Sequence, residues 1–426
     1  MANPSGTRPR TGSIPASSTT ASGTLHSLRV YPAFRLLLLG TLATNSAFWM
    51  FQVAVGWLAL QMTDSPFFVG LTGFAGGIPL LIFSLPAGVI VDRFDRRTVL
   101  LLAQLGVMLM SGLFAIMVGT DLIERWSILV LSAAYGTVMC FIFPTRTTMV
   151  PSLVQRADLA NAIALNAAGQ NATRVVGPSL AGILIATVDV SGTFAVAALM
   201  QIVALYSSWR LPSRASDETG HRAAGTASLT VGLRIVAGDP FLFSLILLAF
   251  ATNVLVMPYL NLMPVFARDE LEVGSTGLGL LLASVGLGTV AGALFVARSA
   301  RLTGWPRAQV VTAAAFTVLV LIFAITPVVA LAVPILFAAG LMSATFLAIN
   351  QTSLQLSVDD AVRGRVFSIY LLSWGALPIG QLAVGAVADH IGAPLAVVIA
   401  CVVSLACVLV IARRFPSLRT QPHPLR

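Results

Sequence analysis

Long apolar segments constrain this chain more than any other feature of its sequence. Twelve of them, each about the length of a membrane helix, follow one another between short polar stretches. Only 10% of the residues are charged and 57% are hydrophobic, whereas about a quarter of the residues in a soluble globular protein are charged. The sequence therefore predicts an all-α membrane protein with twelve transmembrane helices. These helices are expected at residues 33–61, 67–91, 98–119, 126–149, 158–187, 191–209, 240–267, 273–297, 307–326, 329–356, 362–388 and 392–412.

The arginines indicate how these helices cross the membrane. All 25 basic residues are arginine, and 21 of them lie in the two tails and in the even-numbered loops. The odd-numbered loops hold only Arg125 and Arg268, while Arg146 and Arg174 lie inside predicted helices. The positive-inside rule therefore places both termini in the cytoplasm. The net charge of +9 then reflects topology and contact with anionic lipid, and nucleic acid is not an expected partner.

An internal repeat divides the chain into two halves. A shift of 208 residues places Pro32 on Pro240 and residues 43–45 on residues 251–253. Glycines of later helices align at similar shifts. At 204 residues Gly70, Gly73 and Gly88 fall on Gly274, Gly277 and Gly292, and at 203 residues Gly177 and Gly182 fall on Gly380 and Gly385. We expect two six-helix, pseudo-symmetric bundles in parallel orientation, as in many transporters.

Polar composition marks the segments outside the bundles. The expected organisation is a disordered cytoplasmic tail at 1–28, an N-terminal bundle at 29–210, a cytoplasmic linker at 211–239, a C-terminal bundle at 240–414 and a cytoplasmic tail at 415–426. Residues 228–237 of the linker fit two structures. One is a short interfacial helix with Arg234 turned to lipid headgroups, and the other is a flexible connector.

Amides inside the apolar segments point to a polar interior, because a polar group in a bilayer must face protein or water. Helices 1, 4, 7 and 10 carry most of them, together with Arg146. Helices 3, 6, 9 and 12 carry only Gln104, Gln201 and the terminal Gln309. The first set is expected to enclose a polar space, and the second set to face lipid.

Two amides fall near the predicted midplane of the membrane. In helix 1, Asn45, Trp49 and Gln52 share one helical face, and helix 7 repeats the arrangement with Asn253, Met257 and Asn261. Asn45 and Asn253 would then form a symmetric pair at a midplane binding site. The alternative is that each amide bridges neighbouring helices, which is common in membrane bundles. The sequence leaves both readings open.

Helix 5 carries an arginine near the middle of the membrane. Gln170 and Arg174 are four residues apart on one face, and no predicted helix has an acidic residue at that depth. Because exposure of an arginine to lipid is costly, Arg174 must face inward. It could pin helices together, or it could contact an anionic or carbonyl-rich substrate. The candidate cavity residues are Asn45, Trp49, Gln52, Gln170, Arg174, Asn253, Met257, Trp374 and Gln381.

A charged loop at residues 88–97 interrupts the apolar pattern between helices 2 and 3. It resembles the signature loop of the major facilitator superfamily of transporters. Its matching residues are Gly88, Asp92, Arg93, Arg96 and Arg97. The resemblance implies a cytoplasmic gate, in which we expect Asp92 to meet the start of helix 11 or its Arg363, where amide groups favour a carboxylate.

A second element narrows the resemblance. Gly177, Pro178 and Gly182 are similar to a helix 5 element of superfamily members that exchange substrate for protons. The runs at 143–182 and 363–385 look like the twelve-helix branch that contains siderophore exporters, macrolide efflux pumps and a lysophospholipid transporter. This resemblance covers residues 30–412.

These observations predict a secondary transporter that exports small amphipathic molecules by alternating access, in exchange for protons. A monomer in the cytoplasmic membrane is expected. Alternatives are a lipid or lysophospholipid transporter, or a membrane sensor or scaffold of the same fold. No enzyme, cofactor or metal site is expected, because Cys140, Cys401 and Cys407 lack paired spacing and a chain without lysine has no phosphate loop.

Overall fold

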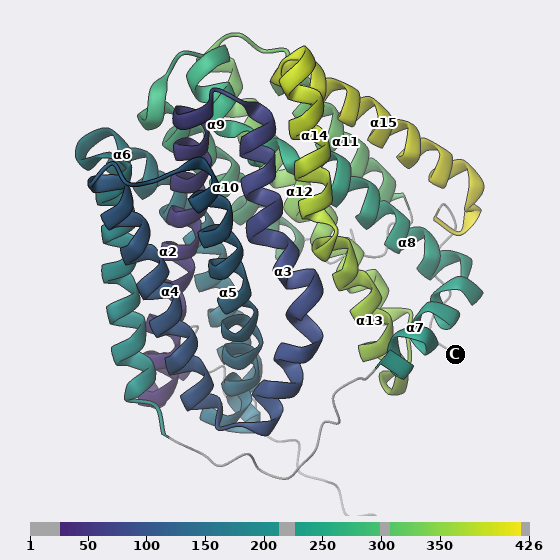
Figure 1. Ribbon diagram of the computed structural model, residues 1–426. Coiled ribbons are helices and arrows are strands. Elements are labelled where there is room, and N and C mark those ends of the chain that lie inside the picture. The colour runs from purple at the N-terminus through teal and green to yellow at the C-terminus, as the bar shows by residue number, and fades with distance from the viewer. Residues whose placement is uncertain (1–25, 213–225, 299–306, 419–426) are drawn as a thin grey trace, which may run out of the picture.

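The computed structural model describes residues 26–212, 226–298 and 307–418, and every regular element within these ranges is a helix. Two groups of long helices stand side by side (Figure 1). This arrangement confirms the predicted all-α membrane fold. Residues 1–25, 213–225 and 419–426, which hold most of the predicted tails and part of the predicted linker, lie outside the described residues.

The N-terminal half contains the six predicted spans. Its elements are α1 (His26–Val30), α2 (Pro32–Thr63), α3 (Pro66–Arg93), α4 (Arg96–Gly119), α5 (Arg125–Leu153), the 3-10 turn η1 (Arg156–Asp158) and α6 (Leu159–Trp209). The long α6 is two spans in one, because Val188 and Asp189 have non-helical backbone angles. The second span of this pair begins beyond that kink, as the sequence predicts.

The C-terminal half repeats the arrangement with more interruptions. Its elements are α8 (Pro240–Ala251), η2 (Thr252–Val256), η3 (Met257–Leu260), α9 (Met263–Val265), η4 (Phe266–Glu270), α10 (Gly274–Arg298), α11 (Ala308–Ala324), α12 (Val329–Leu356), α13 (Asp360–Gly375), α14 (Leu377–Ile391), α15 (Ala393–Arg414) and η6 (Pro416–Leu418). Ten helical segments of the described chain are long and apolar enough to cross a membrane, with the two spans of α6 counted as one segment. The apolar α11, with 17 residues, is slightly shorter.

Helix 7 is not the regular helix that its apolar pattern predicts. After Ala251 the backbone passes through a π turn and a 3-10 turn. Pro258 is the cause, since proline has no N–H to donate to the carbonyl of Val254, four residues earlier. Gly380 of α14 packs against that free carbonyl instead. The expectation that Asn253, Met257 and Asn261 share one helical face is therefore wrong.

The described part of the linker that fitted two structures is a helix. Helix α7 (Thr226–Gly238) lies beside α13, as Figure 1 shows. Val236 is buried in a cluster that also contains Ile369 of α13, while Leu233 and Arg234 are exposed. One face of α7 thus packs on the C-terminal half, and the other is free for lipid.

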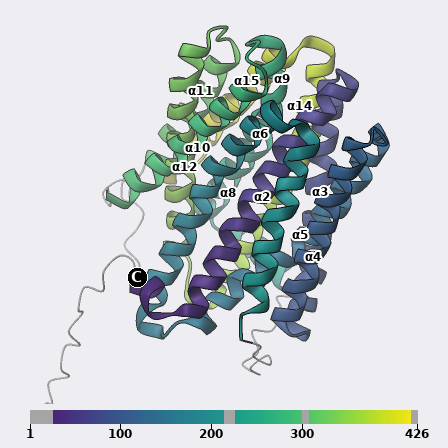
Figure 2. The same ribbon diagram turned by 90° about the vertical axis from the view of Figure 1, so that its left-hand side faces the viewer.

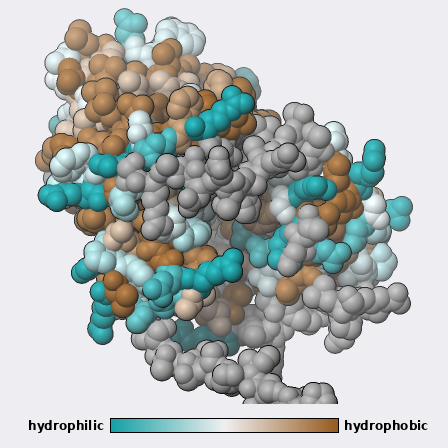
Figure 3. Space-filling view, turned by 90° about the horizontal axis from the view of Figure 1, so that it is seen from below, coloured by the Kyte–Doolittle hydropathy of each residue, from teal (hydrophilic) through white to brown (hydrophobic). Residues whose placement is uncertain are grey.

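The two halves meet at one end of the molecule, which we call the sealed end (residues 60–70, 175–182, 261–286 and 381–389). Helix α3 packs on α14, and α6 packs on α10. Glycines allow the close approach, since a Cβ on Gly182 would lie 2.5 Å from the Cα of Gly279. At the opposite end α3 and α13 diverge (Figure 1), and hydrophilic side chains border a hollow between the halves (Figure 3). Figure 2 shows α2, α3, α4 and α5 of the N-terminal half running side by side.

A buried polar cluster holds the N-terminal half together. Arg146 of α5 is 6% exposed and donates to Leu37 O at 3.1 Å, Thr41 Oγ1 at 3.0 Å and Thr44 Oγ1 at 3.1 Å. With its amide oriented to satisfy its neighbours, Gln104 accepts from Arg146 and donates to Ser208. Arg146 therefore joins helices 1, 3 and 4 and does not line a polar space between the halves.

The C-terminal half contains a related cluster at equivalent positions. Asn350 of α12 donates to Leu245 O at 3.1 Å and to Gln309 Oε1 at 3.4 Å. Leu245 and Asn350 follow Leu37 and Arg146 by 208 and 204 residues. Gln309 likewise follows Gln104 by 205 residues. The internal repeat thus extends to the internal hydrogen bonds of each half.

The glutamines of helices 3, 6 and 9 do not face lipid. Gln104, Gln201 and Gln309 are all buried, and Gln201 accepts from Thr44. Lipid-facing positions of α4 hold exposed apolar residues such as Leu102 and Leu109. Each of these helices therefore has an apolar outer face and a polar inner contact, because an amide in a bilayer needs a protein partner.

Arg146→Met is expected to lower the free energy of unfolding by about 2 kcal/mol, because Gln104 and two threonines lose a buried donor. Thermal unfolding of the detergent-solubilised protein would show this as a lower melting temperature. Arg125→Met is the control, since it removes an exposed arginine at the start of α5. Equal melting temperatures for the two variants would contradict a structural role of the cluster.

Candidate functional site

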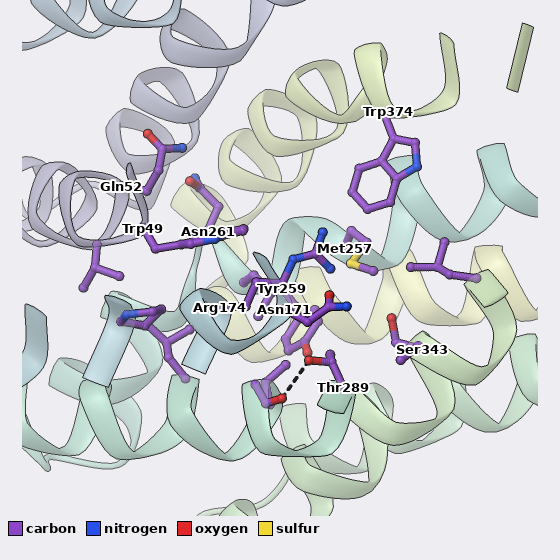
Figure 4. Close-up of a pocket in the computed structure, with 18 of the residues that line it drawn as sticks. Trp49, Gln52, Asn171, Arg174, Met257, Tyr259, Asn261, Thr289, Ser343 and Trp374 are labelled. Atoms are coloured by element: carbon purple, nitrogen blue, oxygen red, sulfur yellow. Dashed lines mark hydrogen bonds between the residues drawn. The ribbon is translucent and has the colours of Figure 1, made fainter. Parts of the chain in front are cut away.

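A cavity of about 390 Å³ lies between the two halves (Figure 4). It is bordered by α2, α6, the broken helix 7, α10, α12, α13 and α14. Its polar and aromatic wall residues are Trp49, Gln52, Asn171, Arg174, Tyr259, Asn261, Thr289, Ser343, Gln351, Trp374 and Gln381. Helix 4 contributes no lining residue, contrary to expectation, because Arg146 of that helix is turned into its own half.

Six of the nine predicted cavity residues come together in this wall. They are Trp49, Gln52, Arg174, Met257, Trp374 and Gln381. They come from five different helices of both halves. Gln52 and Asn261 lie on one side of the cavity in Figure 4, and Trp374 lies on the other. The wall is therefore amphipathic, with amides and one cation set among aromatic and aliphatic side chains.

The other three predicted residues do not line the cavity. Asn253 is fully buried and donates to Ser373 Oγ of α13 at 3.0 Å. This is the bridging contact that the sequence left open as an alternative. Asn45 is also buried. Gln170 does not line the cavity. The face of α6 toward the cavity carries its neighbour Asn171, together with Arg174 and Pro178.

Arg174 is the only charged residue among the described residues that line the cavity. It lies midway between the start of α6 at Leu159 and the kink at Val188, and its side chain is exposed to the cavity. Its guanidinium carbon is 5.9 Å from the ring centroid of Trp49, a cation–π contact. An arginine at mid-membrane costs at least ~2.5 kcal/mol, so this position requires water or a ligand beside it.

The helix 5 element brings three helices together around Arg174. A Cβ on Gly177 would lie 2.6 Å from Trp49 Cβ, so this glycine allows α2 to approach α6. Pro178 lines the cavity. Gly182 packs on Gly279 of α10 at the sealed end. The element therefore positions Trp49 near Arg174 and also forms part of the contact between the halves.

Hydrogen bonds and an ion pair reinforce the sealed end. Arg268 donates to Asp64 Oδ1 at 2.8 Å and to Leu60 O at 3.0 Å. Ser65 donates to Asp389 Oδ1 at 2.6 Å. Asn261 Nδ2, which belongs to the cavity wall, donates to Val69 O at 2.9 Å. These contacts join the halves directly above the cavity.

The predicted gate residues lie at the opposite end. Arg96 donates to Thr148 O of α5, and Arg97 donates to Trp209 O of α6. These two arginines thus bind carbonyls near helix C-termini, a favourable position for a cation. Gly88 lies in α3, and a Cβ added there would meet nothing within 4 Å.

Two further gate residues lie at or near helix ends. Arg93 ends α3 and is exposed. Arg363 donates to Gln355 O and Val358 O at the end of α12. The side chain of Asp92 lies outside the described residues, so its expected meeting with the start of helix 11 stays a prediction.

The apolar pattern of the sequence does not predict several residues of the cavity wall. Tyr259 and Asn261 reach the cavity because helix 7 is broken. Pro258 and Pro264 are the sequence signal for that break. Asn171 could have been found from its spacing of three residues to Arg174, which places both on one helical face.

The fold is shared with solved membrane transporters. A bacterial homologue of the human lysosomal transporter Spinster, in an inward-facing and unoccupied conformation, has a TM-score of 0.71 at 15% identity, over 92% of this chain and 99% of that one. The nucleoside transporter NupG has a TM-score of 0.70 at 12% identity, over 90% and 99%. The described helices, in two halves with a cavity between them, have the fold of these membrane transporters.

The sequence comparisons identify the family. The profile described as transmembrane secretion effector matches residues 22–422. The staphyloferrin A transporter of Staphylococcus aureus is 22% identical over 81% of this chain and 86% of its own length. The multidrug efflux pump Tap of Mycolicibacterium fortuitum is 28% identical over 84% and 89%. The enterobactin exporter EntS of Escherichia coli is 26% identical over 84% and 85%. The chain belongs to the transmembrane secretion effector family and is a transporter of small molecules.

Gly182→Leu is expected to separate the halves at the sealed end, because the added side chain would occupy the space of the α10 backbone. In a cysteine-free background, spin labels at residues 62 and 272 should report a longer distance across this end. Gly112→Leu is the matched control, since an added Cβ there meets nothing within 4 Å. An unchanged distance in Gly182→Leu would show that the glycine contact does not hold the end closed.

Proposed function

We propose that this chain exports small amphipathic molecules across the cytoplasmic membrane by alternating access, in exchange for protons. The observation that carries the proposal is the amphipathic cavity between the halves. It lies at the depth of Arg174 and is covered on one side by the sealed end. The names of the relatives support export, since they include a multidrug efflux pump and an enterobactin exporter.

Alternating access requires rigid halves and a seam that can open. Each half has its own buried polar cluster, around Arg146 in one and Asn350 in the other. At the sealed end the halves meet through glycine contacts and exposed polar contacts, and Asp64 is 80% exposed. An exposed ion pair contributes about 1 kcal/mol or less. Opening the sealed end would therefore cost much less than disrupting either half.

The arginine distribution supports one orientation. The end of the molecule opposite the sealed end carries Arg93, Arg96, Arg97, Arg156 and Arg363. By the positive-inside rule, we propose that this end and both termini lie in the cytoplasm. The cavity would then receive its substrate from the cytoplasm or the inner leaflet. We propose that a single chain is the transporting unit, because the cavity is formed within one chain.

The sealed end also carries two acids from opposite halves. Asp64 and Asp389 each accept hydrogen bonds from the other half, and both lie on the side that would face outward. These contacts must break before the sealed end can open.

Cells that express the chain are expected to accumulate less of a fluorescent amphiphile than cells without it, and collapse of the proton gradient should abolish the difference. Ala344→Trp should also abolish it, because the indole would fill the cavity. Leu199→Trp is the control, at an exposed apolar position outside the cavity wall. Unchanged accumulation of every amphiphile tested would contradict export.

Asp92→Asn is expected to favour the conformation that is open at the arginine-rich end, because a neutral side chain binds helix N-terminal amides or Arg363 less strongly. In a cysteine-free background, Ala348→Cys of the cavity wall should react faster with a membrane-impermeant thiol reagent in inside-out vesicles. Asp121→Asn, in the α4–α5 loop, is the control. Equal reaction rates would exclude Asp92 as a latch.

A further inference from the structure

We propose that the cavity selects anions: Arg174 binds the carboxylate, or an equivalent planar oxyanion, of an amphipathic acid whose apolar body lies against Trp49, Met257 and Trp374. This inference rests on the proposed function and names the substrate class. It is carried by a comparison of the two intramembrane arginines of this chain and by the chemistry of the cavity wall.

Arg146 is an intramembrane arginine with a structural role. Its side chain is almost fully buried, and its guanidinium binds Leu37 O, Thr41, Thr44 and Gln104. These partners come from the protein itself. Arg146 is therefore enclosed by protein groups and does not line the cavity.

Arg174 differs from Arg146 in each respect. Its side chain is exposed to the cavity. Among the described residues, its guanidinium has a cation–π contact with Trp49 and no hydrogen bond. A guanidinium has five N–H donors in a planar fork that matches a carboxylate. The donors of Arg174 are therefore available to a molecule in the cavity. Figure 4 shows its guanidinium directed toward the same space as the amide of Asn171.

The wall around Arg174 favours an anion over a cation. No aspartate or glutamate is among the described residues that line the cavity. A cationic amphiphile would therefore meet a like charge without a counter-charge, which disfavours it. An anionic ligand would instead gain a charge-assisted, bidentate contact.

Three amide side chains lie in the same cavity wall as Arg174. Gln52, Asn171 and Gln381 line the cavity without a hydrogen bond to another described residue. An amide can donate or accept, so these groups suit hydroxyls, amides or carbonyls of a ligand. The aromatic rings and Met257 provide an apolar surface on the remaining wall. An acid with an apolar or aromatic body and further oxygen atoms fits this combination.

The test uses three probes with the same apolar body: pyrenebutyrate, pyrenebutanol and pyrenebutylamine. Binding to the full chain in nanodiscs is measured by energy transfer from tryptophan to pyrene, with empty nanodiscs as the blank. Pyrenebutyrate should bind about tenfold more tightly than pyrenebutanol, and pyrenebutylamine more weakly than both. Equal affinities of the three probes would overturn the proposal.

Variants of the arginine identify the group responsible. Arg174→Gln should reduce pyrenebutyrate affinity at least about tenfold and leave pyrenebutanol within about twofold. Arg174→Lys should retain part of the preference, because it keeps the charge and loses the planar fork. Arg125→Gln is the matched surface control, and unchanged melting temperatures show that each variant is folded. A preference for the anion that persists in Arg174→Gln would overturn the assignment.

The same variants separate this inference from the proposed function. Selective, Arg174-dependent binding of pyrenebutyrate without its movement across vesicle membranes would support the anion site and contradict export. Export of pyrenebutyrate, pyrenebutanol and pyrenebutylamine at equal rates, by the parent chain and by Arg174→Gln alike, would support export and overturn the anion site.

Discussion

The absence of water from the bilayer core is the constraint on which this structure depends. A polar group there must bind protein, or it must face a water-filled space. The chain places two arginines in its membrane helices and treats them differently. Arg146 binds carbonyl, hydroxyl and amide oxygens within one half, whereas Arg174 faces the cavity between the halves. The first contributes to the stability of a bundle, and the second lines the cavity in which we propose that a ligand binds.

The internal repeat explains how two rigid halves arise from one pattern. In each half a polar side chain of the fourth helix binds a carbonyl of the first helix, at Leu37 or at Leu245. The two halves share the position of this polar residue but not its type, because Asn350 stands where the first half has Arg146. An amide makes fewer hydrogen bonds than a guanidinium, so the second cluster is smaller. The C-terminal half is also the half with broken helices, at Pro258 and near Pro378.

Spans, halves and much of the cavity could be predicted from the sequence, because apolar length and repeat spacing are local properties. Arg174 and Trp49 could also be placed, since an intramembrane cation must face inward. The course of helix 7 could not, because the π turn before Pro258 changes the register by which Asn253 and Asn261 were assigned to one face. The hydrogen-bond partners of Gln104 could not be predicted either, since they depend on how separate helices pack.

The contrast between the buried polar clusters and the sealed end supports the proposed movement of the two halves. Within each half, buried hydrogen bonds are costly to break because water cannot replace them in the membrane. At the sealed end, Asp64 and Asp389 are in contact with solvent, so water can replace Arg268 and Ser65 as partners at little cost. Glycine contacts such as Gly182 on Gly279 contribute packing without side chains that interlock. The halves should therefore separate along this seam as intact units, and the cavity at Arg174 should then change the side of the membrane to which it opens.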